Sequence, residues 1–251
     1  MIQVGLMINL PKKLKHDSIV EAVVEIQFDQ TDVGELFVGK LAADAAWAGY
    51  QSQRLPLADL PAMIRDQEPN FKHQPIIQLM RPAPGEIVKI GHRVISLHAL
   101  APYPGWSNFS RRVDALVSAL FEATPAVSIH RLGLRYINAL TSLHGMKSLW
   151  DLNFEMKVAG STPEQDVVTA FKITGDETHA GQISIASPAY VQGSTVPGAV
   201  AFVDVDVFSP SPPGVLEANK VRDWFHSAHD IEKAAFFSLW RDEILTPLRE
   251  D

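Results

Sequence analysis

Four ionisable side chains on two strand-like stretches have the types and spacing suited to ion pairing and to anion binding. Glu21 and Glu25 lie within "IVEAVVEIQF", residues 19–28, and Arg131 and Arg135 lie within "HRLGLRYIN", residues 130–138. Side chains of a strand alternate between faces, so residues four apart share a face. Arginine forks held by glutamates can donate hydrogen bonds to a carboxylate, a phosphate or a peptide.

The alternation of apolar and polar residues predicts how the two stretches lie. Each has an apolar face opposite its charges, formed by Val20, Ala22, Val24, Ile26 and Phe28 in the first and by Leu132, Leu134 and Tyr136 in the second. If the stretches are antiparallel neighbours in one sheet, we expect Glu21 opposite or diagonal to Arg135, and Glu25 likewise to Arg131. As exposed pairs they would fix strand register and contribute about 0–1 kcal/mol each. As partly buried pairs they would favour a role in ligand binding.

The same period-two pattern extends the polar face to other strand-like stretches. It adds Gln78, Lys89, Ser96, His98, Lys172, Gln182, Ser184, Asp204 and Asp206. Acidic and basic side chains balance on this face, which does not suit the phosphate backbone of a duplex. His98 joins Glu21, Glu25, Arg131 and Arg135 as the candidate ligand-binding residues. With Asp204, Asp206 or Glu25 it could also supply the acid and base of an enzyme.

Other candidates indicate no cofactor and no metal. Trp106 precedes a helical stretch and is predicted to be a hydrophobic anchor rather than a ligand platform. His226 and His229 have a spacing that can share a helical face, but we expect a helix break near Ser227 to separate them. The sequence lacks the Gly-x-Ser-x-Gly, Gly-x-Gly-x-x-Gly and phosphate-loop patterns, and no Ser, His and Asp order defines a triad.

Bulk composition narrows the class of protein. The chain has 251 residues, of which 46% are apolar and 20% are charged, the balance of a globular protein in water. Its net charge of -7 argues against broad nucleic-acid binding. No segment approaches the roughly 18 apolar residues of a membrane span, and the N-terminal apolar run precedes its lysines, the reverse of a secretory signal. The absence of cysteine fits a reducing cytoplasm, where we expect the protein.

The order of elements repeats between residues 1–126 and residues 127–251. Each half shows a strand, a helical stretch, several extended segments and a long helix. Residues 107–124 predict the first long helix, capped by Ser107 or Asn108, and residues 217–245 predict the last helical region, broken where Ser227 and Asp230 resemble a capping box. We therefore predict one compact α+β unit. Two pseudo-repeats would form one curved antiparallel sheet with helices on one face. In shape this resembles the saddle of the TATA-box-binding protein or a helix-grip fold.

Three short motifs are similar to those of a sporadically distributed bacterial family whose function is unassigned. They are "VEAVVEI" with Glu21 and Glu25, "YPGWSNF" at residues 103–109, and "LRYIN" at residues 134–138. The resemblance spans most of the chain, with the middle of each half diverging, and implies no reaction, cofactor or catalytic residue.

The leading functional hypothesis is a non-catalytic binding or protein-interaction protein, which holds a protein segment or an anionic small molecule on its polar concave sheet face. The alternative is an enzyme of unrecognised class, a hydrolase or an isomerase, with an acid and base site on the same face. A regulatory nucleic-acid binder is the third hypothesis, and the charge of the chain disfavours it. The hypotheses include no membrane partner.

Overall fold

The computed structural model describes residues 10–29, 33–83, 85–124, 126–163, 167–173, 175–187 and 196–250. Its helices are α1 (Val33–Ala43), α2 (Ala62–Gln67), α3 (Trp106–Ala123), α4 (Ala218–Ser238) and α5 (Asp242–Leu245). Its strands are β1 (Lys13–Leu14), β2 (Ile19–Phe28), β3 (Gln51–Arg54), β4 (Ile77–Arg81), β5 (Glu86–Ile90), β6 (Val94–Leu100), β7 (Ser128–Thr141), β8 (Val168–Ile173), β9 (Ala180–Ala186), β10 (Ala199–Phe208), β11 (Gly214–Val215) and β12 (Arg249–Glu250).

A single antiparallel sheet contains all the strands except β1 and β12. Its order is β3-β4-β5-β6-β2-β7-β10-β9-β8, and β11 adds to β7 beyond this path. The strands β2 and β7 meet at the centre, from the pair Ile19 and Asn138 to the pair Phe28 and Ile129. The sequence-based prediction of one large antiparallel sheet in an α+β protein is confirmed. The two stretches that carry the charges are adjacent strands.

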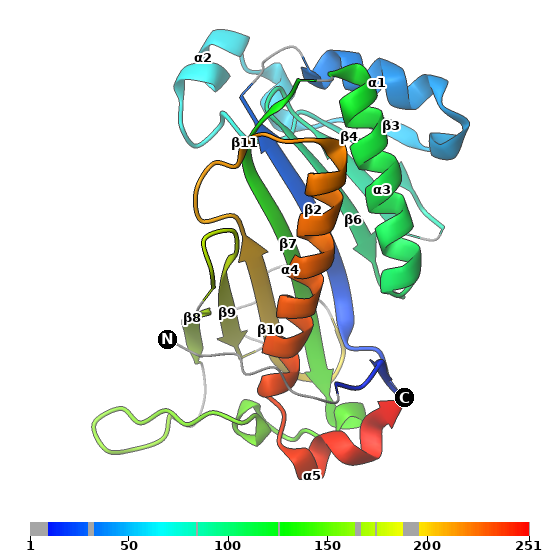
Figure 1. Ribbon diagram of the computed structural model, residues 1–251. Coiled ribbons are helices and arrows are strands. Elements are labelled where there is room, and N and C mark those ends of the chain that lie inside the picture. The colour runs from blue at the N-terminus through cyan, green and yellow to red at the C-terminus, as the bar shows by residue number, and fades with distance from the viewer. Residues whose placement is uncertain are drawn as a thin grey trace.

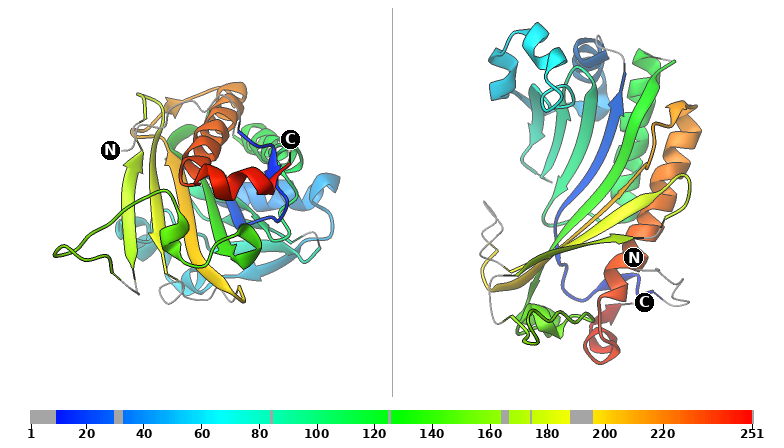
Figure 2. Two further views of the ribbon diagram at one scale, coloured as in Figure 1. Left: turned by 90° about the horizontal axis from the view of Figure 1, so that it is seen from below. Right: turned by 90° about the vertical axis from the view of Figure 1, so that its left-hand side faces the viewer.

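The long helices α3 and α4 lie side by side on one face of the curved sheet (Figures 1 and 2). α1 packs against α3, and α4 packs against β7 and β10. The apolar faces of the strands supply the core beneath these helices, since Val24, Ile26, Leu132 and Leu134 are fully buried. Burial of these faces is the main driving force that holds the helical layer on the sheet.

Both long helices differ from the sequence-based predictions at their ends. α3 begins at Trp106 after Gly105, and neither Ser107 nor Asn108 caps it. α4 runs unbroken through Ser227, so the predicted helix break was wrong. Trp224, Phe225 and Ala228 are buried on both sides of Ser227, and their packing keeps the helix continuous. The chain turns instead between Ser238 and Asp242, before α5.

A second, two-stranded sheet joins β1 to β12 near the end of the chain. Lys13 pairs with Glu250 and Leu14 with Arg249, and the side chain of Lys13 forms a 2.8 Å ion pair with Glu250. This small sheet fixes residues 13–15 beside the lower end of the molecule in Figure 1.

Candidate functional site

The polar face of the central strands forms a cavity of about 490 Å³. Its wall contains all five candidate residues, which come from β2, β6 and β7: Glu21, Glu25, His98, Arg131 and Arg135. Its polar lining also includes Lys89 of β5, Ser96 of β6, Asp206 of β10, and the amide side chains of Gln27 and Gln74. The alternation that buries Leu132 and Leu134 under the helices places Arg131 and Arg135 on this opposite face.

Arg131 joins the two halves of the sheet through a pair of carboxylates. Its guanidinium donates to Glu25 at 3.0 Å and to Asp206 at 3.1 Å. The side-chain amide of Gln27 donates to the same oxygen of Glu25 at 2.8 Å. In the sheet, Glu25 lies opposite Gly133, so the expected pair of Glu25 and Arg131 forms diagonally.

The absence of a side chain at Gly133 leaves space for the guanidinium of Arg131. A Cβ atom at this position would lie 2.5 Å from a terminal nitrogen of Arg131, closer than atoms can pack. The guanidinium therefore folds over the backbone of its own strand, between Glu25 and Asp206. A glycine inside a strand lowers the stability of the sheet, and such glycines often occur where another group approaches the backbone closely.

Arg135 does not pair with Glu21 as the sequence suggested. It donates to both oxygens of Asp204, at 2.8 and 2.5 Å, in a bidentate contact. This hydrogen bonding raises the pKa of Arg135, which keeps the group charged. Glu21 lies diagonal to Arg135 as predicted, but β10 on the other side of β7 offers the diagonal carboxylate of Asp204 as well, and period-two spacing does not say which of the two the arginine binds.

Glu21 belongs instead to a hydrogen-bonded chain with His98 and Ser96. Nδ1 of His98 lies 2.7 Å from a Glu21 oxygen, and Nε2 lies 2.9 Å from the Ser96 hydroxyl. The contact with His98 is the main reason that the pKa of Glu21 is lowered. Because a carboxylate only accepts, Nδ1 of His98 donates to Glu21, which leaves Nε2 for the hydrogen bond with the Ser96 hydroxyl. The sequence placed Ser96 on this face but indicated no role for it.

The hydrogen-bonded row of Glu21, His98 and Ser96 replaces the acid and base pairs that the sequence suggested for an enzyme. Asp204, Asp206 and Glu25 each bind an arginine, so none of them is the partner of His98. Burial raises the pKa of Asp206, and the nearby Arg131 and Arg135 oppose that change. The side chain of His98 is only 9% exposed, and its carboxylate partner is Glu21.

Unlike the two arginines of this cavity, Lys89 has no ion-pair partner among the described residues. It lies opposite Ser96 on the neighbouring strand, and its charge contributes to the lowered pKa of Glu21. Three acidic side chains (Glu21, Glu25, Asp206) and three basic ones (Lys89, Arg131, Arg135) therefore line the cavity.

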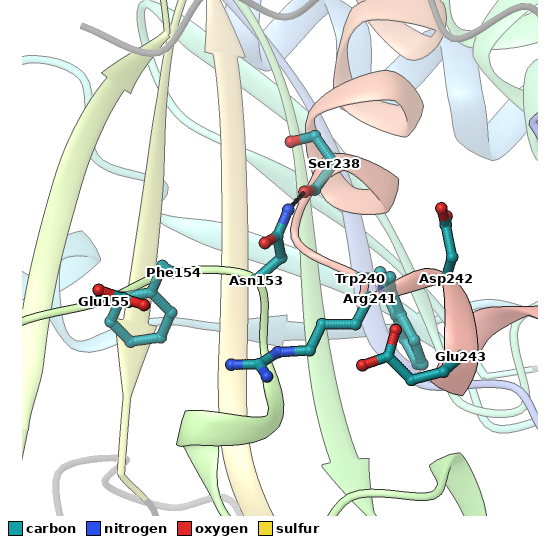
Figure 3. A pocket seen from close by; sticks show the side chains of 8 residues that line it. All are labelled: Asn153, Phe154, Glu155, Ser238, Trp240, Arg241, Asp242 and Glu243. Atoms are coloured by element: carbon teal, nitrogen blue, oxygen red, sulfur yellow. Dashed lines mark hydrogen bonds between the residues drawn. The ribbon is translucent and has the colours of Figure 1, made fainter.

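A larger groove of about 660 Å³ lies between residues 153–155 and the turn after α4 (Figure 3). Its polar groups hold two segments of the chain together. The Asn153 amide donates to the Ser238 carbonyl at 3.3 Å, and Arg241 donates to the carbonyls of Trp150 and Leu152. Because the guanidinium of Arg241 already binds backbone carbonyls, this groove is a weaker candidate for a ligand site than the polar cavity.

The remaining candidates lie on the helical side of the sheet. His226 and His229 share the continuous helix α4, contrary to the prediction that a break separates them. Among the described residues, no group of three His, Cys, Asp or Glu side chains could hold a metal ion. Trp106 is only partly buried and lies against the core. Its ring stacks on His229 at 4.1 Å between centroids and lines a third cavity.

None of the helices among the described residues has the length and apolar character needed to cross a bilayer. No family model matches the sequence, and a comparison with curated proteins finds no match.

Proposed function

We propose that this is a non-catalytic binding protein that holds a segment of another protein in the polar cavity, through Glu21, Glu25, His98, Arg131 and Arg135. The observation that carries the proposal is the ordered network of opposite charges in one cavity. Each arginine is held by at least one carboxylate, so its unused donors are fixed before a ligand arrives. The Arg135 side chain is still 48% exposed and accessible to a partner.

The balance of charge favours a protein segment over a purely anionic ligand. Acidic and basic groups are equal in number around the cavity, so a ligand with both charges can satisfy more of them than a phosphate can. An anionic small molecule is the second occupant that we consider, because Lys89 lines the cavity and forms no ion pair with another of the described residues. Net charge and this balance both disfavour nucleic acid.

We infer that the cavity is formed by two pseudo-repeats, residues 1–126 and 127–251, in a saddle-like arrangement. The matching strand order supports this inference: β2-β6-β5-β4 runs outward on one side and β7-β10-β9-β8 on the other. A long helix follows the last sheet strand of each set, α3 after β6 and, beyond the short β11, α4 after β10. We also infer a cytoplasmic protein of the bacterial family whose motifs it shares.

Affinity capture with Arg135→Ala tests the proposed function. Tagged protein is incubated with extract of the native host, cross-linked, and the captured proteins are quantified by mass spectrometry. We expect a specific partner to fall by about tenfold with Arg135→Ala, since loss of a charged hydrogen-bonding group costs ~1.5–3 kcal/mol. Arg111→Ala, on the exposed side of α3, is the matched control. Equal capture by the wild type and Arg135→Ala would refute the proposal.

A hydrolase is the second candidate function, because Ser96, His98 and Glu21 have the hydrogen-bond order of a nucleophile, base and orienting acid. In such a reaction the Ser96 oxygen attacks a carbonyl carbon while Nε2 of His98 takes the hydroxyl proton, and Glu21 stabilises the resulting imidazolium. The imidazolium returns that proton to the leaving group as the bond between the carbonyl carbon and the leaving group breaks, and water then hydrolyses the acyl-serine. Lys89, opposite Ser96, is placed to stabilise the oxyanion.

Labelling with a fluorophosphonate probe tests this second function. The probe should modify Ser96 in the wild type, and Ser96→Ala should abolish the label while Ser184→Ala, on β9 of the same sheet, keeps it. Absence of label on the folded wild-type protein favours the non-catalytic function, because an activated serine reacts readily with this probe.

A further inference from the structure

A separate cavity of about 350 Å³ lies on the helical side of the sheet. Residues 12–19, residues 103–106, β7 and α4 form its walls. Tyr136 and Asn138 of β7 line it, whereas Arg135, which precedes Tyr136 in the strand, lines the polar cavity on the other face. The two cavities therefore have the strand β7 as a common wall but share no lining side chain.

Glu232 of α4 is the buried carboxyl group of this cavity. It is only 5% exposed, and no ion pair or hydrogen bond joins it to another of the described residues. Buried carboxyl groups are normally paired, because an unpaired one costs several kcal/mol. A buried carboxyl that lines a cavity without a protein partner is therefore a recognition group available to a ligand.

His229 provides a second unpaired group one helical turn away. Its ring stacks on Trp106 at an interplanar angle of 15°, and its Nδ1 atom is buried without a hydrogen-bond partner. The two rings give the cavity an aromatic wall, and the unpaired nitrogen is available to accept a hydrogen bond.

Two tyrosine hydroxyls add further polar groups to the cavity. Tyr103 and Tyr136 lie 2.8 Å apart at their hydroxyl oxygens, and Tyr136 is almost fully buried. One of the two hydroxyl protons forms the hydrogen bond between the tyrosines, so the other proton can be donated to a ligand. Phe236 and Phe237 supply apolar surface beside them.

Cationic side chains lie around the cavity as well. Lys12 is exposed, Lys233 is half-buried, and both line the cavity. Lys13 and Lys15 also line it, but Lys13 pairs with Glu250 and Lys15 donates to the Pro247 carbonyl. The exposed position of Lys12 and the buried position of Glu232 indicate a charged outer end and a polar, aromatic inner end.

We propose that this cavity binds a small aromatic carboxylic acid. Its ring lies along Trp106 and His229, a hydroxyl or amide group at its inner end bonds Glu232 and His229, and its carboxylate faces Lys12 and Lys233. The volume is at the lower end of the range for small-molecule sites, which fits a ligand with a single ring.

The titration of the inner groups supports a ligand whose inner end is uncharged. Burial raises the pKa of Glu232 to about 8, so the group is mostly a neutral acid at neutral pH. Burial lowers the pKa of His229 to about 3, so its ring is neutral. Other titratable groups at the cavity are Asp17, Tyr103, Tyr136, Lys12, Lys13, Lys15 and Lys233. A neutral acid and a neutral imidazole together donate and accept, which suits a phenol or an amide.

Saturation-transfer NMR with 4-hydroxybenzoate tests the proposal on the full chain. We expect saturable binding of 4-hydroxybenzoate. Benzylamine, which is of similar size but cationic, should bind with a Kd about tenfold higher. Lys233→Ala should weaken 4-hydroxybenzoate by about fivefold, and Glu232→Leu by about tenfold. Glu232→Gln keeps both a donor and an acceptor and should bind within about threefold of the wild type.

The control is Arg111→Ala, an exposed residue of α3 that does not line the cavity, with circular dichroism to verify the fold of every variant. Three results would each overturn the proposal. They are no saturable binding of 4-hydroxybenzoate, tighter binding of benzylamine than of 4-hydroxybenzoate, or equal binding of 4-hydroxybenzoate by all four variants: Lys233→Ala, Glu232→Leu, Glu232→Gln and Arg111→Ala. This test is independent of the polar cavity, so failure of one site leaves the other standing.

Discussion

Glu232 should make the protein less stable as the pH rises. Its folded pKa of about 8 lies above its ordinary value of 4.5, so the folded state keeps a proton that the unfolded state has lost. Stability from this group is full below about pH 4.5 and falls until about pH 8, by an amount on the order of a few kcal/mol. Glu232→Gln should remove that fall, which urea unfolding at a series of pH values will measure.

Other titrating groups must be separated from this effect. Burial also raises the pKa of Asp206 and of Asp17, and each adds a fall of the same sign that Glu232→Gln leaves unchanged. The lowered pKa of His229 acts at lower pH, where stability is lost as the pH drops from 6.5 towards 3. The comparison therefore belongs between about pH 6.5 and 8. Parallel stability curves for Glu232→Gln and the wild type would show that Glu232 titrates normally.

Gly133 should be needed only while Arg131 is present. In Gly133→Ala the new Cβ displaces the guanidinium and breaks its contacts with Glu25 and Asp206. Because the displaced group is the end of a flexible side chain, we expect a loss of no more than ~1 kcal/mol. In an Arg131→Ala background the same change should cost nothing, so a double-mutant cycle gives a coupling energy. A coupling energy of zero would mean that Arg131 does not occupy this position.

At the level of the elements, the continuity of α4 can be tested at Ser227. Ser227 is exposed in the middle of α4, so Ser227→Pro removes a helical hydrogen bond and should cost ~3 kcal/mol or more. Ser227→Ala is the control and should stabilise the helix by a few tenths of a kcal/mol. Thermal unfolding followed by circular dichroism measures both. If Ser227 began a new helix, as its sequence suggests, proline there would be tolerated.

The apolar patterns predicted the elements better than the capping residues did. Val113, Leu116, Val117, Leu120 and Phe121 form an apolar stripe at helical spacing that predicts α3, and the first four are buried while Phe121 is partly buried against the core. The spacing of Ser227 and Asp230 resembles a capping box, but a capping box contributes little where buried aromatic residues on both sides favour one helix. Tertiary packing, which no local pattern contains, determined this boundary.

The polar face was predicted from the sequence, and its pairing was predicted only in part. Period-two spacing placed all five candidate residues in one cavity, and the pair of Glu25 and Arg131 is confirmed. The partners of Glu21 and Arg135 could not be predicted, because each strand has two neighbours and long side chains reach diagonally across both. The cavity at Glu232 could not be predicted either, since it depends on where α4 lies over β7.

For the whole molecule, the shared sheet predicts a single unfolding transition. The strands β2 and β7 pair along nearly their full length, and α3 packs on α4 across the same boundary. Tryptophan fluorescence and far-ultraviolet circular dichroism should therefore give coincident urea curves, although 251 residues exceed the usual size of a two-state domain. Leu134→Ala, fully buried at the boundary, should shift both curves and cost ~2–5 kcal/mol. Two separated transitions would mean that the halves unfold independently.

The pairing of β1 with β12 makes one wall of the Glu232 cavity depend on the last residues of the chain. Lys13 and Leu14 are held by Glu250 and Arg249, and the Lys15 amide donates to the Leu248 carbonyl. Filling the cavity should slow deuterium exchange at these amides, although they lie in a two-stranded ribbon of low intrinsic stability.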